Sequence, residues 1–184
     1  RCVSEIPNGI HIEKMVFSES FASKNYINKY SKKAECFVVS DNLFSVLSDT
    51  KNPQGIIAVC RKMSYDIKKI IKKDGFYVIA EEMNDPGNLG TVIRTAHAAG
   101  ADGVILSKGS VDLYNPKVLR STMGSVFKIP VIQNADLAQV TDLMKKSGIS
   151  IYAAHLKGKK LLYELDLKKG CAFMLGNEAR GLSD

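Results

Sequence analysis

Several features that would place a chain quickly in a class are missing here. Among its 184 residues, 45% are hydrophobic, yet no apolar run approaches the roughly 18 to 20 residues that span a bilayer. The first residues are polar, unlike those of a signal peptide. That hydrophobic share is ordinary for a globular protein, which makes disorder a poor explanation, and no repeat or low-complexity tract occurs. We therefore expect a folded, soluble protein of the cytoplasm.

Cysteine and histidine are few and widely spaced. They occur at Cys2, Cys36, Cys60, Cys171, His11, His97 and His155. None forms the close pairs that metal sites and redox motifs require. The cysteines lie mostly among apolar neighbours, where a free thiol behaves as a small hydrophobic group. We expect buried, reduced thiols and no metal.

Acidic residues are outnumbered, and unevenly so. The formal net charge is +7; residues 1 to 74 hold 13 basic and 8 acidic side chains, and residues 75 to 184 hold 13 and 11. A positive N-terminal part suits a polyanion such as RNA, whose phosphates supply sequence-independent affinity. A solvated lysine surface explains the same count, so charge alone leaves both interpretations open.

The first third has the pattern of a small α/β unit. Residues 11–18, 36–40 and 55–60 are apolar or β-branched runs bounded by turn formers, which predicts strands, and residues 42–47 predict a short helix. A lysine-rich stretch then ends at Gly75. We expect one domain over residues 1–62, a linker over 63–74 and a second domain over 75–184.

From Phe76 onward, strand and helix patterns alternate. We expect strands at 76–80, 103–106, 129–132, 149–154 and 172–175, and helices at 89–99, 116–127 and 137–146. Such alternation favours a parallel sheet covered on both faces.

A first polar junction, Asn84 to Ala96, lies between a strand and a helix. Pro86 and Gly87 predict a turn, Asn88 a helix N-cap, and Gly90 a close backbone approach. The free N–H groups of such a helix start attract anions. Arg94 lies off the apolar stripe, and a surface salt bridge to Asp85 or Glu82 is the alternative to a functional role.

A second junction, Leu175 to Ser183, follows another apolar strand. Its glycines, Gly176 and Gly181, are typical of close-approach or left-handed positions at the end of a strand, where open α/β sheets bind ligands. For Glu178 the alternative to function is a solvated turn carboxylate. Arg180 suits either an RNA phosphate or a pair with Glu178.

Together the two junctions resemble the first and second motifs of the SpoU (TrmH-like) RNA ribose methyltransferases of the SPOUT superfamily. The resemblance implies transfer of methyl from S-adenosylmethionine to a ribose 2′-hydroxyl, with ribosomal RNA as substrate and a homodimer as the active form. It implies functional roles for Asn88, Arg94 and Glu178, cofactor contacts at Ala154, Gly176, Asn177 and Gly181, and RNA contacts at Arg120 and Arg180. Ala154 replaces the usual threonine, so its contact would be through the backbone or lost.

The resemblance also has limits. Residues 1–62 resemble an L7Ae-like substrate-binding domain that begins late, inside its first helix. The family's third motif, which completes the cofactor pocket and threads its trefoil knot, has no counterpart before Asp184. We therefore expect an α/β-knot methyltransferase fold with an incomplete knot or missing residues.

Arg94 is expected to position the substrate and not to act as a base. Neutralising a guanidinium of pKa about 12.5 at pH 7 would cost roughly 7 kcal/mol. A clamp on the phosphate beside the target ribose avoids that cost.

Two other classes of protein compete with the methyltransferase: a non-catalytic RNA-binding or assembly protein with the same fold, and a doubly wound nucleotide enzyme that uses Gly87 to Gly90 for phosphate. The second lacks a G-x-G-x-x-G fingerprint.

Overall fold

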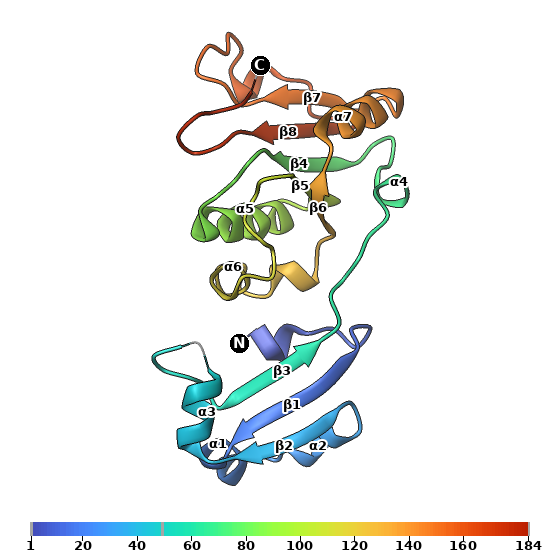
Figure 1. Ribbon diagram of the computed structural model, residues 1–184. Helices are drawn as coiled ribbons and strands as arrows, with labels where there is room; N and C mark the ends of the chain where they lie inside the picture. Colours follow the sequence, from blue (N-terminus) through green and yellow to red (C-terminus); the bar gives the residue numbers. More distant parts are fainter. Residues whose placement is uncertain (1, 49, 184) are drawn as a thin grey trace. The chain divides into compact units, whose positions relative to one another are not determined.

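The computed structural model describes residues 2–48 and 50–183, which form two compact units divided between Met63 and Ser64 (Figure 1). In the first unit, β1 (Ile12–Ser18) is the central strand of three, pairing in parallel with β2 (Glu35–Val39) and antiparallel with β3 (Ile56–Cys60). The three expected strands and the helix at 42–47 are confirmed. The helical segments are η1 (Cys2–Glu5), α1 (Glu19–Lys24), α2 (Asn28–Ser31) and α3 (Asp41–Leu47).

The core of the first unit is aromatic. Phe17 and Phe44 are almost fully buried, and the Phe17 ring lies 6.0 Å from that of Phe21 and 5.5 Å from that of Tyr30. Phe21 and Tyr30 come from α1 and α2, two short helices that the sequence pattern did not reveal. Their apolar residues are too few for a recognisable helical stripe.

The second unit is a parallel five-stranded sheet in the order β6-β5-β4-β8-β7, which confirms the expected sheet. Its strands are β4 (Phe76–Ala80), β5 (Gly103–Ser107), β6 (Val131–Ala135), β7 (Ser150–Ala153) and β8 (Cys171–Leu175). Its helices are α4 (Ile67–Ile70), α5 (Pro86–Ala98), α6 (Pro116–Ser121), η2 (Ser125–Phe127), α7 (Leu137–Lys146) and η3 (Leu162–Glu164). No helix in the described ranges combines the length and hydropathy of a membrane span.

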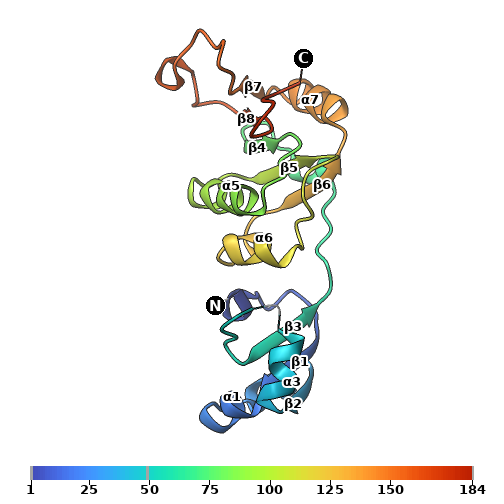
Figure 2. The ribbon, with the colours of Figure 1, turned by 60° about the vertical axis from the view of Figure 1, so that its left-hand side comes forward.

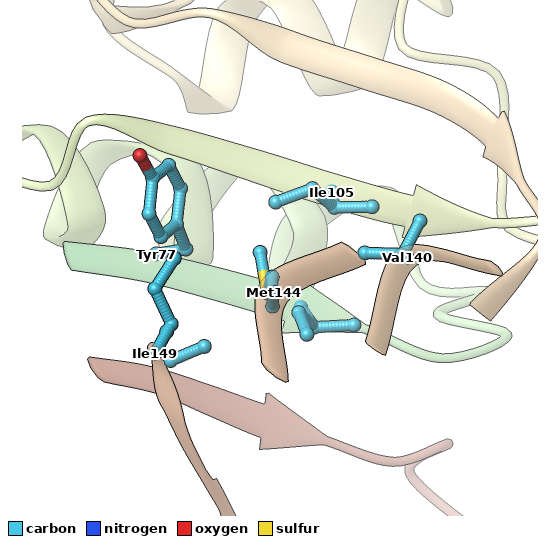
Figure 3. Close-up of a cluster of buried hydrophobic side chains, with 7 residues drawn as sticks. Tyr77, Ile105, Val140, Met144 and Ile149 are labelled. Atoms are coloured by element: carbon cyan, nitrogen blue, oxygen red, sulfur yellow. The ribbon is translucent and has the colours of Figure 1, made fainter. Parts of the chain in front are cut away.

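One face of this sheet packs against α7. Val140 and Met144 of the helix meet Tyr77 and Ile105 of the sheet in a buried hydrophobic cluster (Figure 3). Because side chains alternate along a strand, Val78, Ala80, Val104 and Leu106 point to the other face, and they too are buried. The buried side of α5, with Leu89 and Ile93, makes contact with β5 outside that cluster.

The segment expected as a linker contributes to the second unit. Ile67, Ile70 and Ile71 pack against the α7 cluster. The Tyr77 hydroxyl accepts a hydrogen bond from the N–H of Lys72 at 2.8 Å and donates one to the Ile70 carbonyl at 2.9 Å. Much of residues 64–74 is thus folded onto the sheet, and the linker boundaries stay a prediction.

The helix expected at 116–127 is wrong in its second half. It ends at Ser121, and Met123 and Gly124 follow with φ of 53° and 92°. Two consecutive left-handed residues cannot continue an α-helix, so the chain turns and resumes as the short η2.

The thiols that the structure describes are free. Cys171 is buried and Cys36 and Cys60 are half-buried, in line with the expected packing role. Burial raises the pKa of the Cys60 and Cys171 thiols, which keeps them protonated. The side chain of Cys2 lies outside the described residues.

Candidate active site

The two polar junctions lie side by side at the carboxyl end of the sheet. One follows β4 and the other follows β8, and these strands are hydrogen-bonded neighbours, with β7 on the far side of β8 (Figure 1). The ladder continues past the strand ends, since the N–H of Glu81 donates to the Leu175 carbonyl at 2.8 Å. Residues about 90 positions apart in sequence thereby share one edge.

The helix after β4 begins earlier than expected. Asp85, not Asn88, is the N-cap: its backbone is extended and its carboxylate accepts a hydrogen bond from the N–H of Asn88 at 2.7 Å. Pro86 and Gly87 are the first helical residues and not a turn. The prediction was wrong because an aspartate before a proline is the stronger start signal: proline suits the first helical position, where its missing N–H costs nothing.

Gly90 makes the expected close approach, and its neighbour is α6. A β-carbon at Gly90 would lie 2.2 Å from the Cβ of Ser121 and 2.9 Å from its carbonyl carbon. Only glycine allows α5 and α6 to pack this closely. Arg120, the expected RNA contact, precedes Ser121 and is exposed on the helix that adjoins the first motif.

The loop of residues 176–183 is closed by its own backbone. Asn177 and Gly181 exchange two N–H to carbonyl hydrogen bonds, each of 2.9 Å. The buried Asn177 amide donates to the Glu82 carbonyl at 2.7 Å and accepts from the N–H groups of Ala179 and Arg180 at 2.9 and 3.1 Å. The Asn177 side chain therefore fastens the loop to the end of β4.

Both glycines of this loop are needed for its shape. A β-carbon at Gly176 would lie 2.2 Å from the Gly181 carbonyl carbon and 2.3 Å from the Leu182 nitrogen, so the space is filled by backbone. Gly181 has a φ of 75°, a left-handed value that favours glycine.

Glu178 and Asn88 are brought together at the start of α5. The Glu178 carboxylate accepts from the N–H groups of Asn84 and Asp85, at 3.4 and 3.3 Å, and from the Asn88 amide at 3.4 Å. Partial burial acts to raise the pKa of Glu178, but hydrogen bonds donated by backbone N–H groups and by Asn88 outweigh it and hold that pKa below its usual value. A negative charge beside the positive end of a helix dipole is further stabilised.

An ion pair and a pair of hydrogen bonds to a carboxylate also connect the junctions. Arg180 pairs with Glu82 and not with Glu178, so the ion pair that the sequence analysis considered is not formed. The Glu81 carboxylate accepts from the N–H and hydroxyl of Ser183. Glu82 has a φ of 45°, an uncommon value for a residue with a side chain.

Arg94 is exposed on α5, and the salt bridge to Asp85 or Glu82 that the sequence left as the alternative is not formed. Within the ranges that the structure describes, no carboxylate pairs with it. Helical side chains lean toward the N-terminus of their helix, so we expect the Arg94 side chain to cover the preceding turn of α5. A guanidinium without an internal partner is available to an external anion.

Ala154 lies at the same edge, directly after β7. Its N–H donates to the Met174 carbonyl at 2.9 Å, which extends the ladder between β7 and β8, and its methyl group is exposed. The edge is thus lined by small residues next to polar loops, and no group of metal-ligating side chains was found among the described residues.

Sequence reasoning missed three residues of this edge. Asp85 caps α5, and Glu81 and Glu82 hold the 176–183 loop. The Asp85-Pro86 pair was a readable signal for the first. The two glutamates gave none, because their partners are about 100 positions away in the sequence.

The chain belongs to the SpoU rRNA methylase family, whose model matches residues 75–184. Residues 1–58 match the MRM3-like substrate binding domain. These matches agree with the resemblance that the two junctions carry.

One named relative is similar to this chain over most of the chain's length. The chain is 36% identical over 148 residues to the 23S rRNA (guanosine(2553)-2′-O)-methyltransferase RlmP of Bacillus subtilis, covering 80% of this chain and 58% of the relative. It thus spans a little over half the length of that relative.

Solved structures share the fold. An rRNA methyltransferase from Sinorhizobium meliloti with bound AdoMet has a TM-score of 0.83 and 28% identity, covering 99% of this chain and 68% of the other. The SpoU methyltransferase AviRb from Streptomyces viridochromogenes in complex with AdoMet has a TM-score of 0.86, with 100% and 71% covered, and at 23% identity it speaks for the fold alone.

Proposed function

We propose that this protein is an S-adenosylmethionine-dependent RNA 2′-O-ribose methyltransferase that acts on ribosomal RNA. The observation that carries the proposal is the contact of Glu178 with Asn88 and the first-motif backbone, which unites both motifs at one sheet edge. Support comes from the family match and from the names of the relatives.

The residues at this edge fit the cofactor. Ala154 and Gly181 carry little or no side chain, and a β-carbon at Gly181 would meet no atom within 4 Å, so space is open there. Gly176 and Asn177 shape the loop beside it. When bound, the cofactor would supply a methyl group carried on a positively charged sulfur: the ribose oxygen would bond to the methyl carbon as the carbon–sulfur bond breaks, and the hydroxyl proton would be released.

Each polar residue then has a distinct task. Glu178 fixes the Asn88 amide and the start of α5, so that the helix end presents a constant surface to the RNA. Arg94 clamps the phosphate next to the target ribose and polarises its hydroxyl, because a planar guanidinium binds phosphate through two parallel hydrogen bonds. Arg120 and Arg180 are further RNA contacts. Alignment of the attacking oxygen supplies the main part of the rate gain.

The decisive experiment measures transfer directly. The purified protein is incubated with S-adenosylmethionine labelled in its methyl group and with ribosomal RNA from cells without the gene. We expect label in a nucleotide that resists alkaline hydrolysis, because a 2′-O-methyl group blocks cleavage. RNA binding without cofactor binding by calorimetry would instead identify a non-catalytic RNA-binding protein.

Arg94→Lys tests the clamp. A lysine keeps the charge but loses the bidentate geometry, so we expect kcat to fall by about tenfold or more with cofactor affinity unchanged. Near-normal turnover of this variant in the transfer assay would rule out bidentate clamping.

The proposal extends to a homodimer that works in the cytoplasm, as the family resemblance implies. Light scattering of the purified protein reports its mass in solution, and a monomer at the concentrations of the transfer assay would contradict the dimer.

A further inference from the structure

The chain between β7 and β8 is an excursion of residues 155–170, exposed except for the half-buried Leu165 and the buried Gly170. It leaves the sheet directly after Ala154 and extends away from it (Figure 2). Leu156 and Tyr163 are almost fully solvent-exposed, at 105% and 95%, and Leu161 and Leu162 are also exposed. Large side chains gathered in this way on one segment usually serve a contact.

The excursion is shaped by its own polar groups. The Glu164 carboxylate accepts from the N–H of Leu161 at 2.8 Å, and the Asp166 carboxylate accepts from the N–H of Lys168 at 3.1 Å. The His155 ring accepts from the N–H of Lys157 at 3.0 Å. Both acidic side chains of the segment are therefore occupied by backbone donors.

The basic side chains of the excursion are left without acidic partners. Five lysines lie in it, at Lys157, Lys159, Lys160, Lys168 and Lys169. Within residues 2–48 and 50–183, none of the five forms an ion pair or a side-chain hydrogen bond. The segment thus carries five lysines against two carboxylates, an excess of three positive charges, together with an exposed aromatic ring.

We propose that the 155–170 excursion binds single-stranded RNA, with Tyr163 stacking on a base and Lys157, Lys159 and Lys160 contacting phosphates. Charge selects a polyanion, and aromatic stacking with backbone contacts is how proteins hold unpaired nucleotides. The site adds an RNA-binding surface to the proposed function. Only its role in methyl transfer rests on that function, because RNA bound here would lie next to Ala154, at the edge of the sheet where the cofactor is proposed to bind.

The test measures binding of an oligouridylate of about 20 nucleotides, longer than the usual site for a single strand. A triple variant changes Lys157, Lys159 and Lys160 to Gln. Its matched control changes Lys68, Lys69 and Lys73 to Gln, which removes the same charge near α4. For single strands each phosphate contact contributes about 0.7 to the magnitude of the slope of log affinity against log salt. The slope of the triple variant should therefore be smaller in magnitude by roughly 2. The control should keep the slope of the unaltered protein.

Tyr163 supplies an independent readout. Tyr163→Ala should weaken RNA binding by about tenfold without changing the salt slope, and Tyr163→Phe should retain affinity, since stacking needs only the ring. Calorimetry with S-adenosylmethionine should give the same affinity for every variant. That affinity tests the proposed function separately, because a protein that fails to bind cofactor can still bind RNA here.

Three outcomes overturn the inference: a triple variant with unaltered slope and affinity, a Tyr163→Ala variant that binds normally, or an unaltered protein that does not bind the oligouridylate. Variants that change only the oligomeric mass in light scattering would assign the excursion to a protein contact.

Discussion

Two neighbouring strands end in segments of opposite character. After β8, the 176–183 loop is tied down by its own backbone, by Asn177 and by two glutamates from the end of β4. After β7, the 155–170 excursion satisfies its acids internally and leaves its lysines to solvent. A cofactor pocket needs fixed geometry, whereas a surface for a flexible polymer needs accessible charge. In the proposed function, the 176–183 loop would position the cofactor and the 155–170 excursion would bind RNA, both at one edge of the sheet.

Gly176→Ala should break the rigid side of the comparison most severely. Its β-carbon would lie within 2.4 Å of three backbone atoms, none of which belongs to a flexible side chain. We expect a loss of about 3 kcal/mol in the free energy of unfolding and at least tenfold weaker cofactor binding, because the loop must open. Denaturant titration and calorimetry measure both. Gly9→Ala, where a β-carbon meets nothing, should be neutral.

Asn177→Ala should have the next largest effect. It removes a buried amide that makes three hydrogen bonds and leaves a Glu82 carbonyl and two N–H groups without that partner. We expect about 2 kcal/mol of destabilisation in denaturant titration. The exposed Asn84→Ala is the control and should stay within about 0.5 kcal/mol of the unaltered protein. Equal losses in the two variants would mean that Asn177 does not fasten the loop.

The parallel sheet could be predicted because its strands are short apolar runs between turn formers, and such runs carry their signal locally. The break at Met123 could not, since methionine gives no sign of a left-handed backbone. Nor could the left-handed backbone at Glu82 be predicted, since glutamate gives no sign of it either. The sequence did not predict the hydrogen bond between Glu178 and Asn88, because no local pattern connects residues 90 positions apart. The joint resemblance of both junctions implied only a functional role for each of the two residues.

Asp85→Ala sharpens the comparison at the first junction. It deletes the side-chain cap of α5 and keeps the Asp85 N–H that donates to Glu178, so we expect about 1 kcal/mol of destabilisation. Asp85→Asn should restore most of it, because asparagine caps nearly as well. Asn88→Ala leaves the cap in place and should cost less in the same denaturant titration. A larger loss from Asn88→Ala than from Asp85→Ala would return the capping role to Asn88.

Arg180→Ala should have the smallest effect. Its guanidinium and the Glu82 carboxylate are 71% and 45% exposed, and pairs in water contribute little once side-chain entropy and screening are counted. We expect a loss of about 0.5 kcal/mol or less in denaturant titration, since Asn177 still holds the loop. A drop as large as that of Asn177→Ala would mean that the loop is held by charge. The 176–183 loop would then differ from the 155–170 excursion only in that its charged side chains form ion pairs. In that case high salt should loosen the loop and should also weaken RNA binding by the excursion.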